Sequence, residues 1–155
     1  MNYWLMKSEP ETFGIEHLQR APKSTHCWDG VRNYQARNFM RDTMQLGDKA
    51  FFYHSNCKVP GIIGIVEIVS QSYPDFTAFD PESKYYDPKS TKDNPRWFMR
   101  DIKLIKKFAN IISISELRAN PHLTNMLILR TGNRLSITPV TKQEWQEINK
   151  LIPTS

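Results

Sequence analysis

Residues 61–69 constrain the fold most, because they form a nearly continuous run of β-branched side chains, GIIGIVEIV. Such a run is typical of a strand buried on both faces, whereas a strand with one solvated face alternates apolar and polar residues. Gly64 interrupts the run and indicates a bend or a bulge. The run therefore predicts a fully buried strand with an irregularity near its middle.

Shorter apolar runs predict further strands at residues 3–7, 50–53, 96–108 and 135–138. Pro139 is expected to end the last of them. Short helices are predicted after Asn33 and after two capping boxes at residues 113–116 and 141–144, and Trp145 is expected to dock the final helix. Strands and helices alternate without a regular βαβ rhythm. This predicts an α+β fold, a small mixed β barrel wrapped by short helices, rather than a doubly wound sheet.

A chain of 155 residues is expected to form one domain, residues 1–155. Its formal net charge of +5 fits a polyanionic partner. The two cysteines, Cys27 and Cys57, are too few for a disulfide framework, which indicates an intracellular, cytoplasmic protein. The sequence shows no basic leader followed by an apolar run and no stretch of about 18 apolar residues, so no signal peptide or membrane span is expected.

The segment WDGVRNYQARN, residues 28–38, gathers groups that a ligand site needs. Gly30 permits a sharp turn and Asn33 is a good N-cap, so Trp28 falls on a loop just before a helix. Free N–H groups at a helix start favour an anion such as phosphate, and an aromatic face beside them would seat a flat base. The alternative is that Trp28 is a core residue beside a solvated helix face.

Residues 70–96 form a segment with four prolines and five aromatic side chains. Loops of this length in a compact domain are usually functional or disordered, and the aromatic content argues against disorder. We expect an ordered excursion that walls a pocket.

The common catalytic signatures are absent from the sequence, including the P-loop, the dinucleotide fingerprint, HExxH and GxSxG. A Cys27–His54 nucleophilic pair is possible, although a buried, inert Cys27 is favoured. Asp29 is expected to fix its loop through Arg32. A zinc set is disfavoured because two of its members are adjacent and would splay apart; it would comprise His26, Cys27, His54 and Cys57. No metal or cofactor is therefore expected.

A reader of nucleobases needs an aromatic slot, polar groups at the base edge and cations for the backbone. The candidate base-binding residues are Ser8, Glu9, Trp28, Asn33, His54, Ser55, Tyr86 and Trp97. The candidate phosphate-binding residues are Lys7, Arg32, Arg37, Arg41 and Lys58. Core packing is the alternative for Trp97, and strand-end capping for His54 and Ser55. Solvation or local ion pairing is the alternative for Arg37 and Arg41.

Segments spread in order along the chain resemble the EVE domain family. They are YWLMKSEP (3–10), WDGVRN (28–33), ARN (36–38), GD (47–48), YHSN (53–56), YYDP (85–88), RW (96–97), RLS (134–136) and PVT (139–141). The resemblance covers about residues 2 to 152. The chain looks like a bacterial stand-alone version of this domain. The resemblance implies a PUA-like fold, a mixed β pseudobarrel flanked by short helices.

The resemblance also implies a pocket for a modified base, including modified cytosine in DNA, and a relation to YTH domains, which read methylated adenine in RNA. It carries no established catalytic residue. Trp28 occupies the place of a YTH cage tryptophan, and Tyr86 is preferred to Trp97 as the second wall. One departure is Arg100, where the family has an apolar residue. In the pocket this arginine would alter ligand preference, and in solvent it would alter nothing.

Two functions remain open at this point. The first is a non-catalytic module that reads a modified base in DNA or RNA, with no membrane or metal partner. The second is a small enzyme that acts on a modified nucleoside or base through the same pocket, with His54 or Asp29 in acid–base work. The sequence favours the first, because no nucleophile, metal set or cofactor motif is legible in it.

Overall fold

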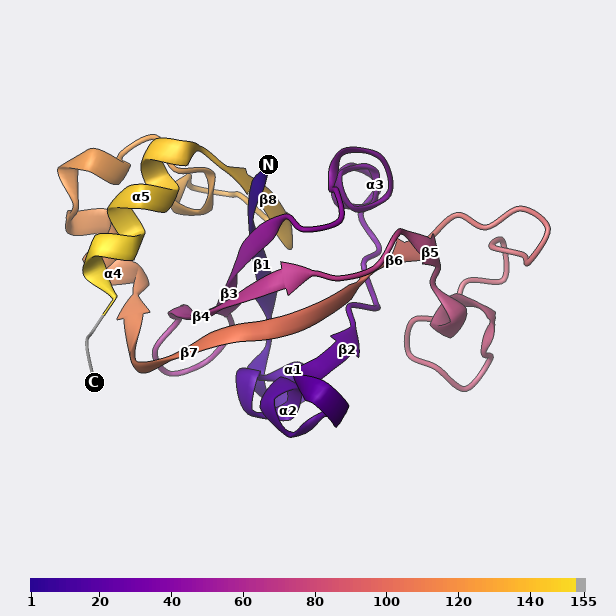
Figure 1. The fold of residues 1–155 in the computed structure, drawn as a ribbon. Helices are drawn as coiled ribbons and strands as arrows, with labels where there is room; N and C mark the ends of the chain where they lie inside the picture. The colour runs from indigo at the N-terminus through magenta and orange to yellow at the C-terminus, as the bar shows by residue number, and fades with distance from the viewer. Residues whose placement is uncertain (153–155) are drawn as a thin grey trace.

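The computed structural model describes residues 1–152 and shows a curled six-stranded sheet surrounded by short helices (Figure 1). Strands β1 (Tyr3–Ser8) and β3 (Lys49–His54) pair in parallel, and the other neighbouring pairs of this sheet are antiparallel. In spatial order the strands are β2 (Thr25–Cys27), β7 (Asp101–Ser113), β4 (Gly61–Ile68), β3 (Lys49–His54), β1 (Tyr3–Ser8) and β8 (Ile137–Val140). A small second sheet joins β5 (Tyr73–Pro74) to β6 (Phe98–Met99). The predicted α+β class, with a mixed curled sheet, is confirmed.

Strand β4 is the predicted buried strand, and it lies between β3 and β7. Its pairing with β7 shifts register between Ile62 and Gly64, so the expected bulge is present. A Cβ added at Gly64 would lie 2.3 Å from the side chain of Ile15, the first residue of a helix packed against the sheet. Glycine is therefore needed at this position for close packing as well as for the bulge.

The alternation of side chains along the central strands divides the apolar residues between two clusters. Trp4, Met6 and Phe52 belong to one cluster, which also receives helices α2 (Ile15–Arg20) and α3 (Tyr34–Asn38). Leu5 and Phe51, their immediate neighbours in sequence, belong to the other, which is closed by helices α4 (Ile114–Ala119) and α5 (Lys142–Leu151). Buried strands thus contribute both faces to the core, as the β-branched run predicts.

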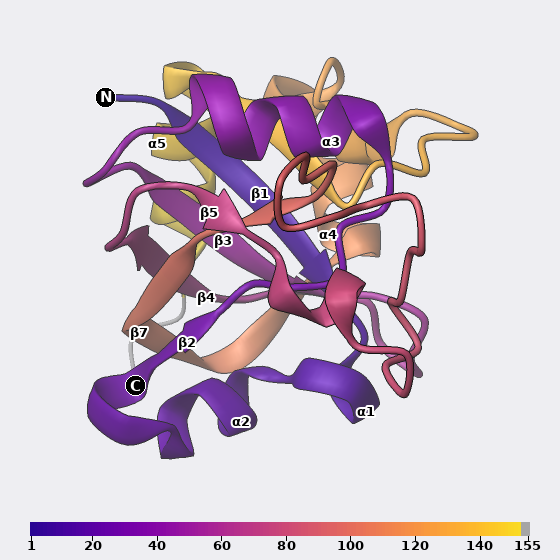
Figure 2. The same ribbon diagram turned by 90° about the vertical axis from the view of Figure 1, so that its right-hand side faces the viewer.

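The helices are short, and Figure 2 shows α1 and α2 below the sheet and α3 above it. Their bounds are α1 Pro10–Phe13, α2 Ile15–Arg20, α3 Tyr34–Asn38, α4 Ile114–Ala119 and α5 Lys142–Leu151. Single 3₁₀ turns lie at Pro22–Ser24, Phe76–Phe79, Pro121–Leu123 and Leu127–Leu129. No helix within residues 1–152 has the length and apolarity required to cross a membrane.

Several local predictions are confirmed at the helix ends. The Asn33 side chain accepts from the N–H of Ala36, and both predicted capping boxes, at Ser113 and Thr141, are formed. Trp145 docks α5 by stacking on two rings, with centroids 4.5 Å and 4.2 Å away; these belong to Tyr3 and Phe51.

Pro139 does not end the last strand as expected, because β8 continues through it to Val140. Strand β8 is the last strand of the sheet, so the missing proline N–H can face outward without breaking a ladder bond. Helix α3 also differs from expectation, because it passes into a π-helical turn at Phe39–Thr43.

Arg100 lies between β6 and β7 and is only 3% exposed. Its guanidinium donates to the carbonyl oxygens of Met40, Met44 and Ser70. Two of these acceptors lie in or directly after the π-helical turn, where backbone carbonyls lose their usual helical partners. Arg100 therefore points neither into a pocket nor into solvent; it fastens the π-helical turn to the sheet.

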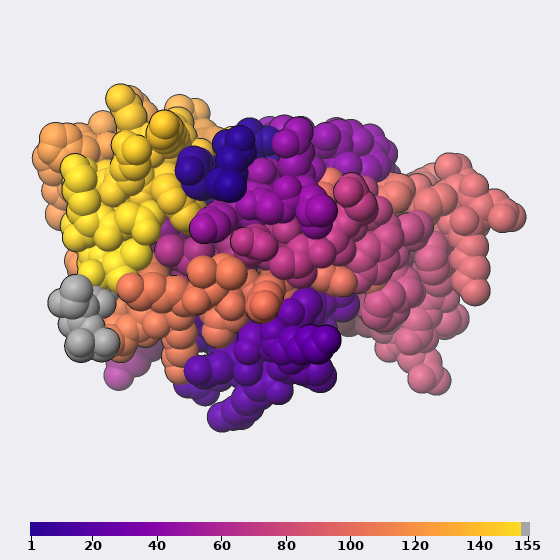
Figure 3. Space-filling model, viewed as in Figure 1, coloured from indigo at the N-terminus to yellow at the C-terminus, as the bar shows by residue number. Residues whose placement is uncertain are grey.

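The excursion between β4 and β7 is ordered by its own turns and by the small sheet of β5 and β6. The space-filling view shows this segment protruding at one end of the molecule (Figure 3). Its inner part folds back against the loop after β2, which brings the two predicted functional segments together.

Candidate functional site

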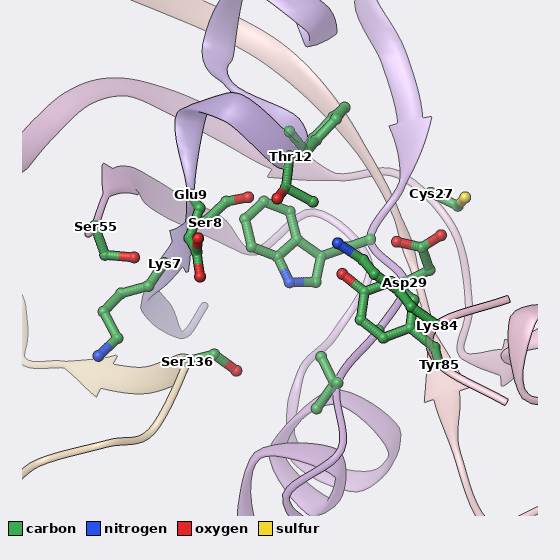
Figure 4. Close-up of a pocket in the computed structure, with 14 residues that line it drawn as sticks. Lys7, Ser8, Glu9, Thr12, Cys27, Asp29, Ser55, Lys84, Tyr85 and Ser136 are labelled. Carbon is green, nitrogen blue, oxygen red and sulfur yellow. The ribbon is translucent and has the colours of Figure 1, made fainter. Parts of the chain in front are cut away.

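A pocket of about 420 Å³ opens where the excursion meets the loop after β2 and the end of β1 (Figure 4). Its walls are aromatic and its rim is polar, with two lysines, two carboxylates and several hydroxyl groups. The lining comes from β1 and α1 (Lys7, Ser8, Glu9, Thr12, Phe13), from residues 27–31, and from Ser55, Lys84, Tyr85 and Ser136. Pockets of this size and composition suit a small planar ligand.

Trp28 belongs both to the core and to the pocket. Its ring meets Phe52 and Phe13 edge to face, at centroid distances of 5.5 Å and 6.0 Å, and it is only 5% exposed. Within residues 1–152 nothing accepts a hydrogen bond from its indole N–H. The indole nitrogen is nevertheless not shut off from solvent. The exposed edge of the ring thus offers an unpaired donor to the pocket, while the rest of the ring packs in the core.

The second aromatic ring at the pocket belongs to Tyr85, whereas Tyr86, the residue expected from the sequence, is 41% exposed and does not line it. Tyr85 lies directly over Gly30, where an added Cβ would come within 2.6 Å of the ring. Gly30 has φ +81°, which favours glycine for a second reason. The turn that contains residues 83–86 determines which of the two adjacent tyrosines faces the pocket. The periodicity of the sequence does not predict this choice.

Arg32, a predicted phosphate ligand, has its guanidinium engaged within the protein, where it fastens the Trp28 loop to the excursion. Its guanidinium donates to the Tyr85 carbonyl oxygen at 2.8 Å and 3.0 Å and to Asp75 Oδ2 at 2.9 Å. Asp75 is fully buried and also accepts from the Gly30 N–H at 2.8 Å. The expected Asp29–Arg32 pair is therefore replaced by a pair with Asp75, 43 residues away from Arg32 in sequence.

Four of the predicted residues besides Trp28 reach the pocket: Lys7, Ser8, Glu9 and Ser55. The parallel pairing of β1 with β3 brings them together, and the Ser55 N–H donates to the Ser8 carbonyl oxygen at 3.0 Å. Burial lowers the pKa of Lys7. Phe13, Thr12, Lys84 and Ser136 were not predicted, because their approach depends on the path of the chain and not on a local motif.

Asn33, His54 and Trp97 lie away from this pocket. Asn33 is used as the cap of α3. Trp97 is buried, donates to Asp87 Oδ2 at 2.7 Å and stacks on Tyr34 at 4.8 Å. The contacts of Trp97 are thus those of a core residue, and the contact of Asn33 is that of a helix cap.

His54 accepts a hydrogen bond at Nε2 from the Ile15 N–H, at 3.1 Å, and so holds the start of α2. Burial lowers its pKa below the usual 6.5. With a lowered pKa, His54 in the folded protein binds fewer protons than it does in the unfolded chain. The stability that neutral His54 contributes is therefore complete above about pH 6.5 and is lost as the pH falls towards the lowered pKa. We expect the free energy of unfolding to decrease between pH 7.5 and pH 5.

In the His54→Gln variant the side-chain oxygen can still accept from Ile15 but does not titrate. Urea unfolding of both proteins at the two pH values measures the effect. The wild type should lose more stability than the variant on acidification. An equal loss in both proteins would show that His54 does not titrate in this way.

The remaining predicted cations lie outside the pocket. Arg37 donates to the Arg96 carbonyl oxygen at 2.9 Å and lies 4.7 Å from the Tyr34 ring centre. Arg41 forms an ion pair with Asp42 at 2.7 Å, as the local-pairing alternative holds. Lys58 is exposed in the loop after β3. A phosphate-binding role for these three residues stays a prediction.

Cys27 lines the pocket, and burial, aided by Asp29 and Asp101, raises the pKa of its thiol to about 11. Its Sγ lies 3.7 Å from His26 Nδ1, and His54 is bonded elsewhere. A thiol with a raised pKa is a poor nucleophile at neutral pH. Across residues 1–152 no group of three or more His, Cys, Asp or Glu side chains is arranged to hold a metal ion.

The curled mixed sheet with short flanking helices, and the aromatic pocket at the end of β1, define a PUA-like α+β protein. The chain belongs to the EVE domain family, whose pattern matches residues 2–151.

Rat thymocyte nuclear protein 1 is 48% identical over 97% of this chain and 73% of its own length. A solved protein from Pseudomonas putida is 46% identical, with a TM-score of 0.91 over 96% of this chain and 98% of that one. Human THYN1, solved in complex with 5-methylcytosine containing DNA, is 45% identical, with a TM-score of 0.92 over 100% of this chain and 99% of that one. Because these proteins come from animals and from bacteria, the expected bacterial origin is not supported.

Proposed function

We propose that the protein is a DNA-binding module without catalytic activity, which holds a modified cytosine in the pocket beside Trp28. The observation that carries this proposal is an aromatic slot with an unpaired indole N–H, closed on a second side by Tyr85. The complex of human THYN1 with 5-methylcytosine containing DNA supports it, because that protein has the same fold at 45% identity. A base reaches such a pocket by leaving the stack, as in other proteins that read or process single bases.

The charges around the pocket fit a nucleic-acid strand. Lys7 and Lys84 line it, and Arg37 lies on α3, the helix that follows the Trp28 loop. Cations of this kind supply affinity that depends on salt and not on sequence. We assign phosphate contacts first to the two pocket lysines, because the Arg32 guanidinium is occupied by Asp75 and by the Tyr85 carbonyl.

The enzymatic alternative receives less support from the side chains. His54, its first acid–base candidate, is bonded to the Ile15 N–H and does not line the pocket. Cys27 lines the pocket, but the raised pKa of its thiol opposes nucleophilic attack. Asp29, the other acid–base candidate, lines the pocket, where its carboxylate can equally serve to bind a ligand.

Fluorescence anisotropy with labelled DNA tests the proposal. Single-stranded and duplex DNAs that differ only in one cytosine, 5-methylcytosine or 5-hydroxymethylcytosine are compared at fixed salt, with matched RNAs as a second panel. One buried methyl group is worth about 0.8 kcal/mol, so we expect binding about fourfold tighter for 5-methylcytosine than for cytosine. Equal affinity for all the DNAs, changing only with salt, would contradict the proposal.

A further inference from the structure

Asp29 is a pocket carboxylate that the surrounding hydrogen-bond network leaves free. The neighbouring carboxylates are occupied: Asp75 accepts from Gly30 and Arg32, Asp101 accepts from Tyr73, and Glu9 accepts from Asn56 at 3.2 Å. Within residues 1–152, the Asp29 carboxylate has no hydrogen bond or ion pair with another residue, and its one protein donor is its own main-chain N–H. The carboxylate is therefore available to a donor from a ligand.

The surroundings of Asp29 make a carboxylate without a further hydrogen-bond donor unfavourable unless a ligand supplies one. The residue is half-buried between Trp28 and Gly30, and burial, together with the charge of Asp75, raises the pKa of its carboxyl group. In the view of Figure 4 the carboxylate lies beside Tyr85 and Lys84 and away from Glu9. A partly desolvated acceptor without a donor is unfavourable, so a bound group that donates to it gains more than it would in water.

We infer that Asp29 reads the base edge, by accepting a hydrogen bond from the exocyclic amino group of the cytosine. This inference rests on the proposed function and names the residue that sets its base specificity. Cytosine presents an N4 amino donor, and aspartate is a suitable acceptor for it. Thymine presents the O4 acceptor at the same position, where it would face the carboxylate oxygens and repel them.

The inference separates two kinds of selectivity that the pocket would need. Thymine and 5-methylcytosine both carry a methyl group at C5, so an apolar slot against Trp28 favours both over unmethylated cytosine. Only the edge contact tells thymine from 5-methylcytosine. The methyl preference therefore belongs to the aromatic walls, and the amino preference to Asp29.

The test uses short single-stranded DNAs of adenine with one central base, either cytosine, 5-methylcytosine or thymine. Single strands remove differences in the cost of unpairing. The wild-type protein should bind 5-methylcytosine about tenfold or more tightly than thymine. In Asp29→Asn the carboxamide can also donate to O4, so this ratio should fall towards one, while the preference for 5-methylcytosine over cytosine persists.

Asp93→Asn is the matched control, because it makes the same change of charge at an exposed residue that does not line the pocket. It should leave both ratios as in the wild type. Thermal unfolding of each variant verifies that it is folded. Because the Asp29 carboxylate is bonded to no other residue within the described part of the chain, residues 1–152, we expect the Asn variant to fold normally.

The outcomes distinguish this inference from the proposed function. A wild-type protein that binds thymine as tightly as 5-methylcytosine overturns the inference before any variant is made. An unchanged ratio in Asp29→Asn, with the methyl preference intact, also overturns it and leaves the proposed function standing. If the wild type does not prefer 5-methylcytosine to cytosine, the proposed function fails, and Asp29 is still judged by the ratio to thymine.

Discussion

Replacing Asp75 by alanine is expected to lower the free energy of unfolding by about 3–5 kcal/mol, the usual cost of removing one partner from a buried ion pair. Asp75 is fully buried, while the Arg32 side chain paired with it is 22% exposed. The same carboxylate accepts from the N–H groups of Gly30 and Thr77. Its loss would leave these two N–H groups without their acceptor, and the Arg32 guanidinium would lose its carboxylate partner while keeping the Tyr85 carbonyl.

Urea unfolding followed by circular dichroism measures this change. Asp42→Ala is the control, because the Asp42 side chain is 54% exposed and an exposed ion pair such as its pair with Arg41 contributes little to stability. If both variants lost the same small amount, Asp75 would not fasten the Trp28 loop to the excursion.

Replacing Tyr85 by alanine is expected to weaken binding of 5-methylcytosine containing DNA by about 1–3 kcal/mol, the range found for one base stacked on one aromatic side chain. Tyr85 lines the pocket, and its ring lies over Gly30. Its main-chain carbonyl, which Arg32 contacts, remains in the variant, so the connection between the two segments persists. The loss should therefore appear in affinity more than in stability.

Tyr86→Ala provides the control from the adjacent residue, since Tyr86 is exposed and lies outside the pocket. It should bind as the wild type does. Both affinities come from anisotropy titrations at one salt concentration. A larger loss in Tyr86→Ala than in Tyr85→Ala would restore the original sequence-based choice of the second wall and would argue against this pocket.

Variants of Trp28 are less direct tests, because the residue has two roles. Its ring packs against Phe13 and Phe52 in the core, so Trp28→Ala would create a cavity there as well as remove a pocket wall. Trp28→Phe keeps most of the packing and removes the indole N–H. Loss of affinity in this variant is therefore easier to interpret.

The parts of the fold that sequence predicted well depend on local interactions. The β-branched run predicted β4, and the side chains of Ser113 and Thr141 predicted the starts of two helices. Each of these patterns acts within a few residues, through burial on both faces of a strand or through a cap. Asn33 was also a correct N-cap, and its side-chain oxygen is used by the Ala36 N–H.

The parts that sequence missed depend on contacts between distant segments. Arg32 contacts Asp75 only because the excursion folds back on the loop after β2. The residues next to Arg32 and Asp75 in the sequence do not predict this ion pair. His54 and Ser55 are neighbours at the end of β3, yet Ser55 lines the pocket and His54 holds α2. Likewise, Arg100 serves a π-helical turn that no sequence pattern had indicated.

The most direct test of base reading follows the indole N–H signals of ¹⁵N-labelled protein during titration with DNA. The chain has four tryptophans, and two of these groups are occupied: Trp4 donates to Asp48, and Trp97 donates to Asp87. The Trp28 signal is assigned by its absence in Trp28→Phe. We predict that it shifts on addition of 5-methylcytosine DNA, at lower concentration than with cytosine DNA, while the Trp4 and Trp97 signals stay nearly unchanged. A Trp28 signal that does not move at saturating DNA would contradict a base bound in this pocket.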